Sequence, residues 1–245
     1  MTALIVLIAA ALLLLVFTFI RRRRSSAVFR EIEAYERLKH AVGQAVEDGT
    51  RLHVSIGRGN LFTARGGSAL AGLAMLRRLS ERTSLSDHPP VVTSGDASLA
   101  ILSQDTLQSG YRAAGAEDQY RFTTGRVAGL TPFAYAAGTI PVMWDENVSA
   151  NVVIGDLGSE AGLLADAAGN KETDLIAASD NLSAQSVLFA SSPEPLIGEE
   201  LFAAGAYLGA GASHEASLQV QDVLRWLVIL AILGGAVLKF FGVGF

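Results

Sequence analysis

An uncharged apolar run, Ala3 to Ile20, opens the sequence and constrains everything that follows it. Four consecutive arginines end this run: Arg21, Arg22, Arg23 and Arg24. At about 1.5 Å per helical residue, its 18 positions cover most of a hydrocarbon core about 30 Å thick. Basic clusters favour the cytoplasmic side of a membrane, so we expect residues 1–24 to be a transmembrane anchor whose N-terminus lies outside the cytoplasm.

A cleaved signal peptide is the alternative interpretation of this run. Signal peptides carry their positive charge before the apolar segment and small residues at the cleavage site. Here the charges come after the apolar segment, and the bulky residues Phe17 to Ile20 stand where cleavage would need small ones. We therefore predict an anchor that is not removed.

A second apolar segment covers residues 223–245. Its uncharged part, Trp226 to Leu238, is short for a membrane span, but Arg225 and Lys239 can extend from its two ends toward opposite interfaces. We predict a second transmembrane helix, with a surface or re-entrant helix as the alternative. Two spans in the cell (inner) membrane place both termini outside the cytoplasm and the remaining domain inside it, and they make lipid a partner of the chain.

The charges between these segments are unevenly distributed. Glu31 to Arg126 contains 11 basic and 11 acidic residues, whereas Val127 to Asp222 contains 13 acidic residues and a single basic one, Lys171. An acidic surface repels phosphate backbones, which argues against nucleic-acid binding. The acidic half is either an ordinary solvated surface or a polarised face that meets a basic partner. The absence of cysteine excludes disulfides, thiolate catalysis and cysteine metal sites.

The residues between the two spans are predicted to form a linker helix and one α/β domain. In 25–50, apolar residues recur at three- and four-residue spacing, which indicates an amphipathic linker helix that ends at Asp48 and Gly49. In 51–209, short apolar runs alternate with helical stretches. This pattern predicts a mainly parallel sheet of five or six strands with helices on both faces, a Rossmann-like three-layer fold flanked by the two transmembrane helices. Residues 210–222 are predicted to be a flexible joint.

The predicted strands are short apolar runs that glycine, serine or aspartate terminates. They comprise residues 52–56, 91–94, 120–124, 151–154 and 174–178. Residues 186–190 are either a sixth strand or the end of a short helix, and we favour the strand. The predicted helices cover residues 67–80, 98–114, 131–140, 159–170 and 196–208.

A glycine-rich turn after the first predicted strand is the first candidate binding site. Gly57, Arg58 and Gly59 resemble the start of a dinucleotide-binding turn, but Phe62 occupies the position of its third glycine. The backbone amides at the start of the helix from Gly67 can hold a phosphate, with Arg58 or Arg65 as counter-charge. The alternative is a purely structural turn, which the incomplete fingerprint favours.

Three aspartates that follow predicted strands form the second candidate. Asp96, Asp156 and Asp180 share the carboxyl edge of the sheet if its strands are parallel, and Ser159 opens the helix after Asp156. Carboxylates in such a place hold a cation or act as an acid–base pair, but aspartate after a strand more commonly caps the next helix. We predict no cofactor and no metal site, because the histidines share no ligand spacing. They are His40, His53, His88 and His214.

Four blocks of the sequence carry a family resemblance: Ala41–Ala45 with Asp48–Gly49, Ala71–Leu73, Phe133–Gly138 and, most specifically, Leu196–Leu208. They are similar to an uncharacterised family of prokaryotic membrane proteins, domain of unknown function 6754. The similar region, Glu33 to Leu208, covers about three quarters of the chain. The resemblance implies a membrane anchor joined to an α/β domain, and it implies no activity.

No intact catalytic motif is present, because no serine lies in a G-x-S-x-G elbow and no Walker lysine motif occurs. We therefore expect a homo-oligomeric scaffold or an accessory subunit of a larger membrane complex. The alternative is an α/β domain, catalytic or not, that binds a nucleotide or another small phosphorylated ligand at the carboxyl ends of its strands. Transport is disfavoured, because two spans without internal charges offer no path except through an oligomer.

Overall fold

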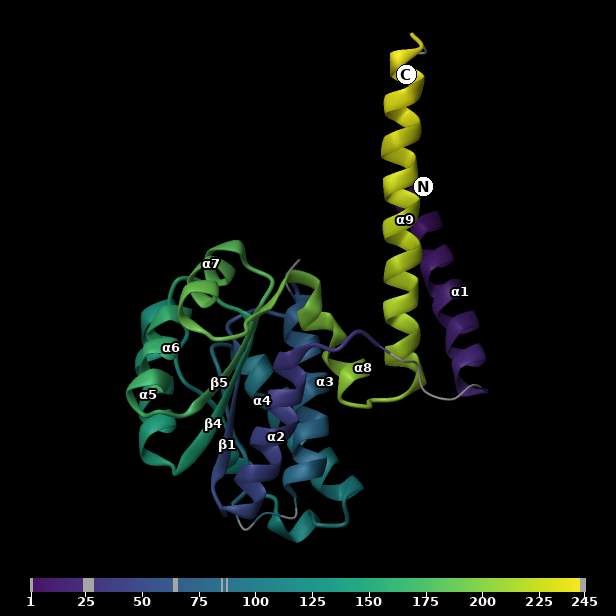
Figure 1. The fold of residues 1–245 in the computed structure, drawn as a ribbon. Coiled ribbons are helices and arrows are strands. Elements are labelled where there is room, and N and C mark those ends of the chain that lie inside the picture. The colour runs from purple at the N-terminus through teal and green to yellow at the C-terminus, as the bar shows by residue number, and fades with distance from the viewer. Residues whose placement is uncertain (1, 24–28, 64–65, 85, 87, 243–245) are drawn as a thin grey trace. The chain divides into compact units, whose positions relative to one another are not determined.

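The computed structural model describes residues 2–23, 29–63, 66–84, 86 and 88–242. The chain divides into two units, one made of residues 1–29 and 209–245 and the other of residues 30–208. The first unit contains the two long apolar helices and the second contains the α/β domain (Figure 1). Each unit is described by itself below.

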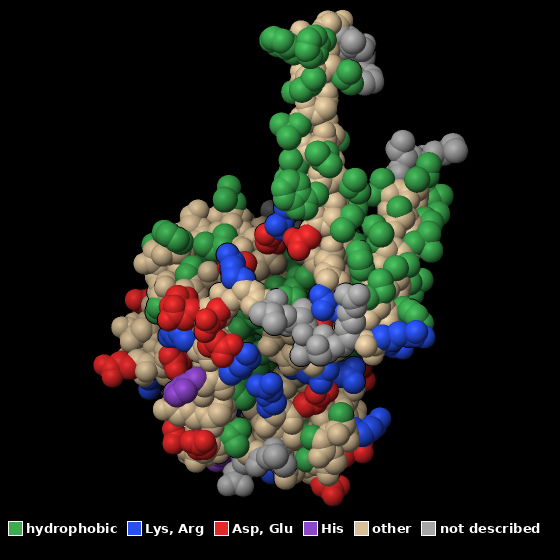
Figure 2. All heavy atoms as spheres, turned by 45° about the vertical axis from the view of Figure 1, so that its right-hand side comes forward, with side chains coloured by type: hydrophobic (Ala, Val, Ile, Leu, Met, Phe, Trp, Pro, Cys, Tyr) green, Lys and Arg blue, Asp and Glu red, His purple; other side chains and the backbone are tan. Residues whose placement is uncertain are grey.

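The helical unit consists of α1, Thr2–Arg22, and α9, Ala212–Phe240, which lie side by side and run in opposite directions (Figure 1). Both helices are long and apolar enough to cross a membrane, and hydrophobic side chains cover much of their visible surface (Figure 2). Near the end of α1, Arg21 Nε donates a hydrogen bond to Gln219 Oε1 at 3.3 Å. The prediction of two apolar helices that flank the domain is therefore confirmed, while Arg24 lies outside the described residues.

The second apolar helix begins earlier than predicted. Because α9 starts at Ala212, most of 210–222, predicted as a flexible joint, is helical. Ala216 and Val220 are buried one helical turn apart, which gives this half of α9 a packing face that a joint would lack. The prediction was wrong here because the small residues from Gly209 to Ser213 are also typical of loops.

The α/β unit is built on one six-stranded sheet in which every pairing is parallel. Its strands are β1 Arg51–Gly57, β2 Val91–Ser94, β3 Gly125–Val127, β4 Val148–Asp156, β5 Asp174–Ser179 and β6 Leu196–Ile197. Their spatial order is β3-β2-β1-β4-β5-β6. The predicted α/β fold is therefore confirmed, and the strand order, which the sequence left open, is that of a doubly wound sheet.

Helices cover both faces of this sheet (Figure 1). One face carries α2 Glu33–Glu47, α3 Gly66–Thr83 and α4 Ala97–Ala113, and the other carries α5 Pro132–Asp145, α6 Ala161–Asn170 and α7 Leu182–Ser191. Shorter helical turns complete the unit: η1 Glu117–Gln119, η2 Phe122–Thr124, η3 Gly198–Ala203 and α8 Ala204–Tyr207. The chain changes face between β3 and β4, because right-handed crossovers on the two sides of β1 place their helices on opposite faces.

Neighbouring residues of β1 show how the two faces are filled, since successive strand side chains point to opposite sides. Ile56 points toward α3, where Gly72 allows a close approach: a Cβ added to Gly72 would lie 3.1 Å from the Ile56 side chain. Ser55 points the other way and shares a hydrogen bond with the Tyr135 hydroxyl of α5. Ser55, Ile56 and Tyr135 are fully buried, so packing fixes the end of β1 between its two helical layers.

Two elements begin later than predicted. Helix α2 starts at Glu33, and Ile32 before it is extended, so only the second part of 25–50 is shown to be helical. Residues 120–124, predicted as a strand, contain the turn η2, and β3 starts only at Gly125. A Cβ added to Gly125 would lie 2.9 Å from the Gln104 side chain of α4, so glycine lets the strand pass close to that helix.

The sixth strand lies elsewhere than predicted. Residues 186–190, predicted as a strand, belong to α7, whose N-cap Asn181 accepts a hydrogen bond from the Ser183 amide. Leu196–Ile197, predicted to open a helix, instead pairs with Ala178 and Ser179 of β5 and forms β6. A two-residue edge strand is too short to show a periodic pattern, which explains why the sequence did not reveal it.

Candidate functional site

The carboxyl edge of the sheet is where doubly wound folds bind ligands and where the predicted site residues belong. The strand order reverses between β1 and β4, so in such folds the loops after these two strands diverge and leave a crevice. The candidates that follow β1 and β4 are Arg58, Gly59, Asp156 and Ser159, while Arg65 lies outside the described residues. What these residues contact decides whether a ligand can enter.

An ion pair fills this position from within the protein. Arg58 donates from Nε to Glu160 Oε1 at 2.7 Å. Glu160, the N-cap residue of α6, is 2% exposed, and the same oxygen accepts the Gly158 amide at 2.9 Å, whereas Ser159 is exposed. Burial alone would raise the pKa of the Glu160 carboxyl, but the Gly158 amide and the Arg58 guanidinium outweigh it and hold the pKa below its usual value. Arg58 and Glu160 are therefore a matched pair of charges, here called the plug.

Backbone contacts hold the plug in place. The Arg58 amide donates to the Asp156 carbonyl oxygen at 2.9 Å, and the Gly95 amide donates to the Gly57 carbonyl oxygen at 2.8 Å. Gly57 has φ +69°, and a Cβ added to Gly95 would lie 2.9 Å from the Arg58 Cβ, so both positions require glycine. These hydrogen bonds tie the ends of β1, β2 and β4 to one another.

The other residues predicted to hold a phosphate have neighbours of their own. Gly59 is buried, whereas Gly67 is exposed in the first turn of α3. Phe202 Cε1 lies 3.5 Å from the position of a Cβ added to Gly67. Phe62, which replaces the third glycine of the fingerprint, is 91% exposed. The structure therefore brings Arg58 to a carboxylate and leaves Gly67 beside an aromatic ring.

The three predicted aspartates have different surroundings. Asp96 is the N-cap of α4, and its Oδ1 accepts two amides of the first helical turn at 2.9 Å and 3.2 Å. Asp156 ends β4 and accepts the Asn181 side-chain amide at 3.5 Å, and Asp180 directly follows β5. In the described ranges, no group of three or more histidine, aspartate or glutamate side chains could hold a metal ion. Asp96 therefore acts as a helix cap, which was the alternative interpretation of its position.

Four large apolar side chains at this edge are 70% to 91% exposed. We call them the apolar rim: Phe62, Leu130, Phe133 and Leu182. Each follows the carboxyl end of a strand, Phe62 after β1, Leu130 and Phe133 after β3, and Leu182 after β5. The Tyr135 hydroxyl accepts the Gly57 amide at 3.2 Å, which ties the first turn of α5 to the end of β1. All four rim residues therefore belong to the loops and first helical turns at this edge of the sheet.

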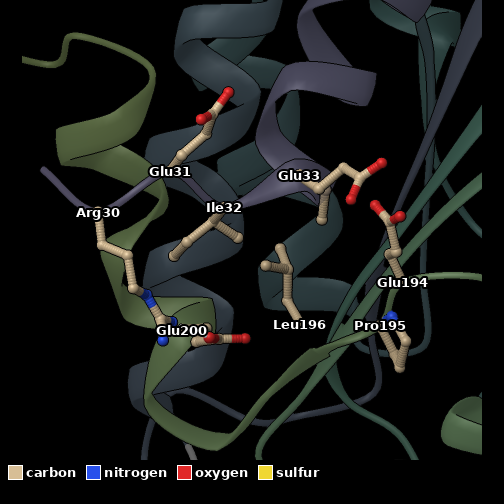
Figure 3. Close-up of a pocket in the computed structure, with 9 residues that line it drawn as sticks. Arg30, Glu31, Ile32, Glu33, Glu194, Pro195, Leu196 and Glu200 are labelled. Carbon is tan, nitrogen blue, oxygen red and sulfur yellow. Dashed lines mark hydrogen bonds and ion pairs between the residues drawn. The ribbon is translucent and has the colours of Figure 1, made fainter.

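A second cluster joins the two ends of the α/β unit. Arg30 Nη2 lies 2.6 Å from Glu200 Oε1 (Figure 3), and the Tyr207 hydroxyl donates to the Arg30 carbonyl oxygen at 2.6 Å. The Tyr35 hydroxyl donates to the Glu200 carbonyl oxygen at 2.5 Å, and its ring stacks on that of Tyr207 with centroids 4.8 Å apart. The block Leu196–Leu208, which carries the most specific resemblance, thus fastens the last turn of the unit to its first residues.

A hollow of about 280 Å³ lies beside this cluster, with Arg30, Ile32 and Glu200 in its walls. Figure 3 shows Glu33 and Glu194 in the same hollow with their carboxyl groups facing each other. Burial and the charge of Glu33 raise the pKa of the Glu194 carboxyl. The hollow is acidic, but its carboxylates are not arranged as a metal site, so it does not identify a ligand.

Comparisons with known proteins identify a family and no activity. A family model described as Domain of unknown function (DUF6754) matches residues 1–245. No curated protein and no solved structure matches the chain. The function therefore has to be argued from the residues of the chain itself.

Proposed function

We propose that the chain, which belongs to the DUF6754 family, is a membrane-anchored assembly module whose α/β domain docks onto a second copy through the apolar rim. In this proposal α1 and α9 cross the cell membrane, and the arginines from Arg21 to Arg23 lie at its cytoplasmic side. The α/β domain is then cytoplasmic. The module serves as a scaffold, or as an accessory subunit of a larger membrane complex.

The plug is the observation that carries this proposal. Doubly wound sheets bind small ligands at this position. Here Arg58 forms an ion pair with the buried Glu160. The large apolar side chains beside the plug are exposed. Such side chains gain free energy when another protein surface covers them, at about 25 cal/mol per Å² of buried apolar area.

A second copy suits the apolar rim because an apolar surface is complementary to itself. Two copies related by a two-fold axis bury the same residues on both sides of the contact. Two anchors in each chain also confine the copies to one plane, which raises their effective concentration.

Light scattering of the detergent-solubilised full chain tests the proposed contact. We expect the wild type to have the mass of a dimer or a larger oligomer, and Phe62→Ser combined with Phe133→Ser to have the mass of a monomer. Phe122→Ser combined with Phe189→Ser is the matched control, because these phenylalanines are similarly exposed but lie away from the rim. A monomeric wild type, or an equal response of the two double variants, would contradict the proposal.

The proposed topology has its own test. A reporter fused after Phe245 is expected to behave as extracytoplasmic, because two spans return the chain to the side on which it began. A reporter inserted at Gly115, in the turn after α4, is expected to be cytoplasmic. A cytoplasmic signal at Phe245 would rule out the two-span arrangement and leave the contact between domains to be judged by light scattering.

A further inference from the structure

The amino edge of the same sheet contains a hollow of about 450 Å³ that the proposed assembly does not use. Its walls come from the start of β1, from the loop before β2 and from the connection before β3. Two arginines and a histidine line it: Arg51, Arg121 and His88. The volume suits a small molecule, since ligand pockets are commonly about 300–1,000 Å³.

The charges around this hollow are not balanced. Arg51 Nη1 lies 2.8 Å from Glu146 Oε2, and Arg126 binds both oxygens of the same carboxylate at 2.7 Å and 3.1 Å. Arg121 is exposed and forms no ion pair with another described residue. Asp118 adds one carboxylate to the lining. Among the described lining residues together with Glu146 and Arg126, three guanidinium groups therefore stand against two carboxylates, in a chain whose net charge is −5.

Two buried donors that do not themselves line the hollow have no hydrogen-bond partner among the described residues. They are the hydroxyl of Tyr111, a residue that is 1% exposed, and Nε of Arg126. Burial raises the pKa of the Tyr111 hydroxyl, and the positive charge of Arg51 acts in the opposite direction. Buried donors without a partner are rare in native proteins and commonly mark the place of a water, an ion or a ligand.

We propose that this hollow binds a small soluble molecule that carries a phosphate group and a hydroxyl group. Arg51 and Arg121 donate charge-assisted hydrogen bonds to the phosphate, a group that the planar guanidinium matches well. Asp118 accepts a hydrogen bond from the hydroxyl. The site is distinct from the plug, because Arg51 begins β1 and Arg58 follows its opposite end, and it does not depend on assembly.

Calorimetric titration of the full chain in detergent with glycerol 3-phosphate tests this proposal, and glycerol is the uncharged control ligand. We expect saturable binding of glycerol 3-phosphate and none of glycerol. Arg121→Gln is expected to weaken binding about tenfold, as the loss of one charge-assisted hydrogen bond would. Arg82→Gln is the matched control, because Arg82 is another exposed arginine, in the last turn of α3 and outside the hollow.

Tyr111→Phe adds a second measurement. Because it removes a buried hydroxyl that has no partner and does not line the hollow, we expect the melting temperature without ligand to stay level or rise, and the increase caused by glycerol 3-phosphate to persist. Equal affinities of the wild type and Arg121→Gln, or the absence of saturable binding to the wild type, would overturn the proposal. Equal weakening by Arg82→Gln would do the same, since it would reduce the effect to general surface charge.

Discussion

The two edges of one parallel sheet differ in how their arginines are paired. At the carboxyl edge, Arg58 has a carboxylate of its own, Glu160, which is 2% exposed. At the amino edge, Arg51 and Arg126 share Glu146, and the exposed fractions of these three side chains lie between 22% and 40%. At the first edge the arginine and its carboxylate are paired one to one, whereas at the second edge two arginines share one carboxylate beside the hollow.

The comparison suggests a ligand site from the pairing of charges as well as from the place in the fold. Doubly wound sheets take ligands at the carboxyl edge because loops and helix N-termini converge there. In this chain the plug pairs Arg58 with Glu160 at that edge. The Tyr111 hydroxyl and Arg126 Nε, by contrast, have no hydrogen-bond partner among the described residues. Analogy with the fold alone therefore suggests a site at the carboxyl edge, whereas the charges and donors of the side chains favour the amino edge.

Breaking the plug is expected to have the largest effect. Glu160→Ala leaves the Arg58 guanidinium, 23% exposed, without its carboxylate. Removal of one partner from a buried ion pair costs about 3–5 kcal/mol, and we expect about 3 kcal/mol because Arg58 keeps some contact with water. Urea unfolding of the full chain, followed by fluorescence in a Trp226→Phe background, measures the loss. Trp144, the other tryptophan, reports on the fold because its Nε1 donates to the Ala167 carbonyl oxygen at 3.0 Å.

Glu146→Ala is the counterpart of this variant at the amino edge. It releases two arginines that already contact water, so we expect a loss of about 1 kcal/mol, which is the upper value for an exposed ion pair. Arg58→Met combined with Glu160→Met removes both charges of the plug and is expected to recover most of the loss. Equal losses in the two alanine variants would contradict the difference between the edges.

The glycine beneath the plug gives the second prediction. A Cβ at Gly95 would lie 2.9 Å from the Arg58 Cβ and 3.1 Å from its Cα, so Gly95→Ala has to displace the plug. We expect a loss of about 2 kcal/mol in the same unfolding assay, as for other overpacked sites. Gly43→Ala is the matched control: no atom lies within 4 Å of the added Cβ, and alanine inside α2 is expected to stabilise the fold by about 0.5–1 kcal/mol. A fully stable Gly95→Ala would mean that the plug is loosely held.

The interior between the two edges contains a titratable group, His53 in β1. It is fully buried, and its Nδ1 and Nε2 each lie 2.9 Å from a partner, Asn151 Oδ1 and Thr93 Oγ1. Burial lowers the pKa of His53 from 6.5 to about 4, although the hydrogen bond to Asn151 and the charge of Glu146 act in the opposite direction. His53 is therefore neutral in the folded protein at neutral pH.

The unfolded chain binds the His53 proton at a higher pH than the folded chain does. The contribution of His53 to the free energy of unfolding is therefore fully present above pH 6.5 and is lost as the pH falls toward 4. From pH 7 to pH 5, His53 alone is expected to lower the free energy of unfolding by about 2 kcal/mol. Urea unfolding at the two pH values measures the change. His53→Gln, which cannot titrate, is expected to lack this contribution, and an identical pH dependence in both proteins would exclude His53 as its source.

The fold could be predicted because its strands are buried on both faces. Val91–Ser94 and Asp174–Ser179 are almost entirely buried, and strands of this kind appear in a sequence as short apolar runs between turn residues. The elements that were missed have no such run. The strands β3 and β6 have three and two residues, and α7 buries only Ala184 and Leu188, so neither helical nor strand periodicity marks them.

The candidate site was harder to predict because its pairs depend on strand order. Arg58 and Glu160 are 102 positions apart and meet only because β1 lies beside β4. The one local signal of Glu160 is its place shortly after a strand-end glycine, and an ordinary helix start has the same pattern. Arg51 and Glu146 are 95 positions apart, so no local sequence pattern predicts this pair either. Asp96, in contrast, was interpretable because a helix cap involves only residues next to it in the chain.

Asp96 gives the smallest expected effect and separates a cap from a ligand at the carboxyl edge. If it only caps α4, Asp96→Ala costs about 1 kcal/mol and Asp96→Asn costs almost nothing, because asparagine accepts the same amides without the charge. A carboxylate kept for a cation behaves in the opposite way, since both substitutions would relieve repulsion without ligand and abolish any stabilisation by Mg²⁺. Unfolding midpoints of the wild type and both variants, with and without Mg²⁺, therefore distinguish the two roles, and a stabilised Asp96→Ala would favour a binding site at the carboxyl edge.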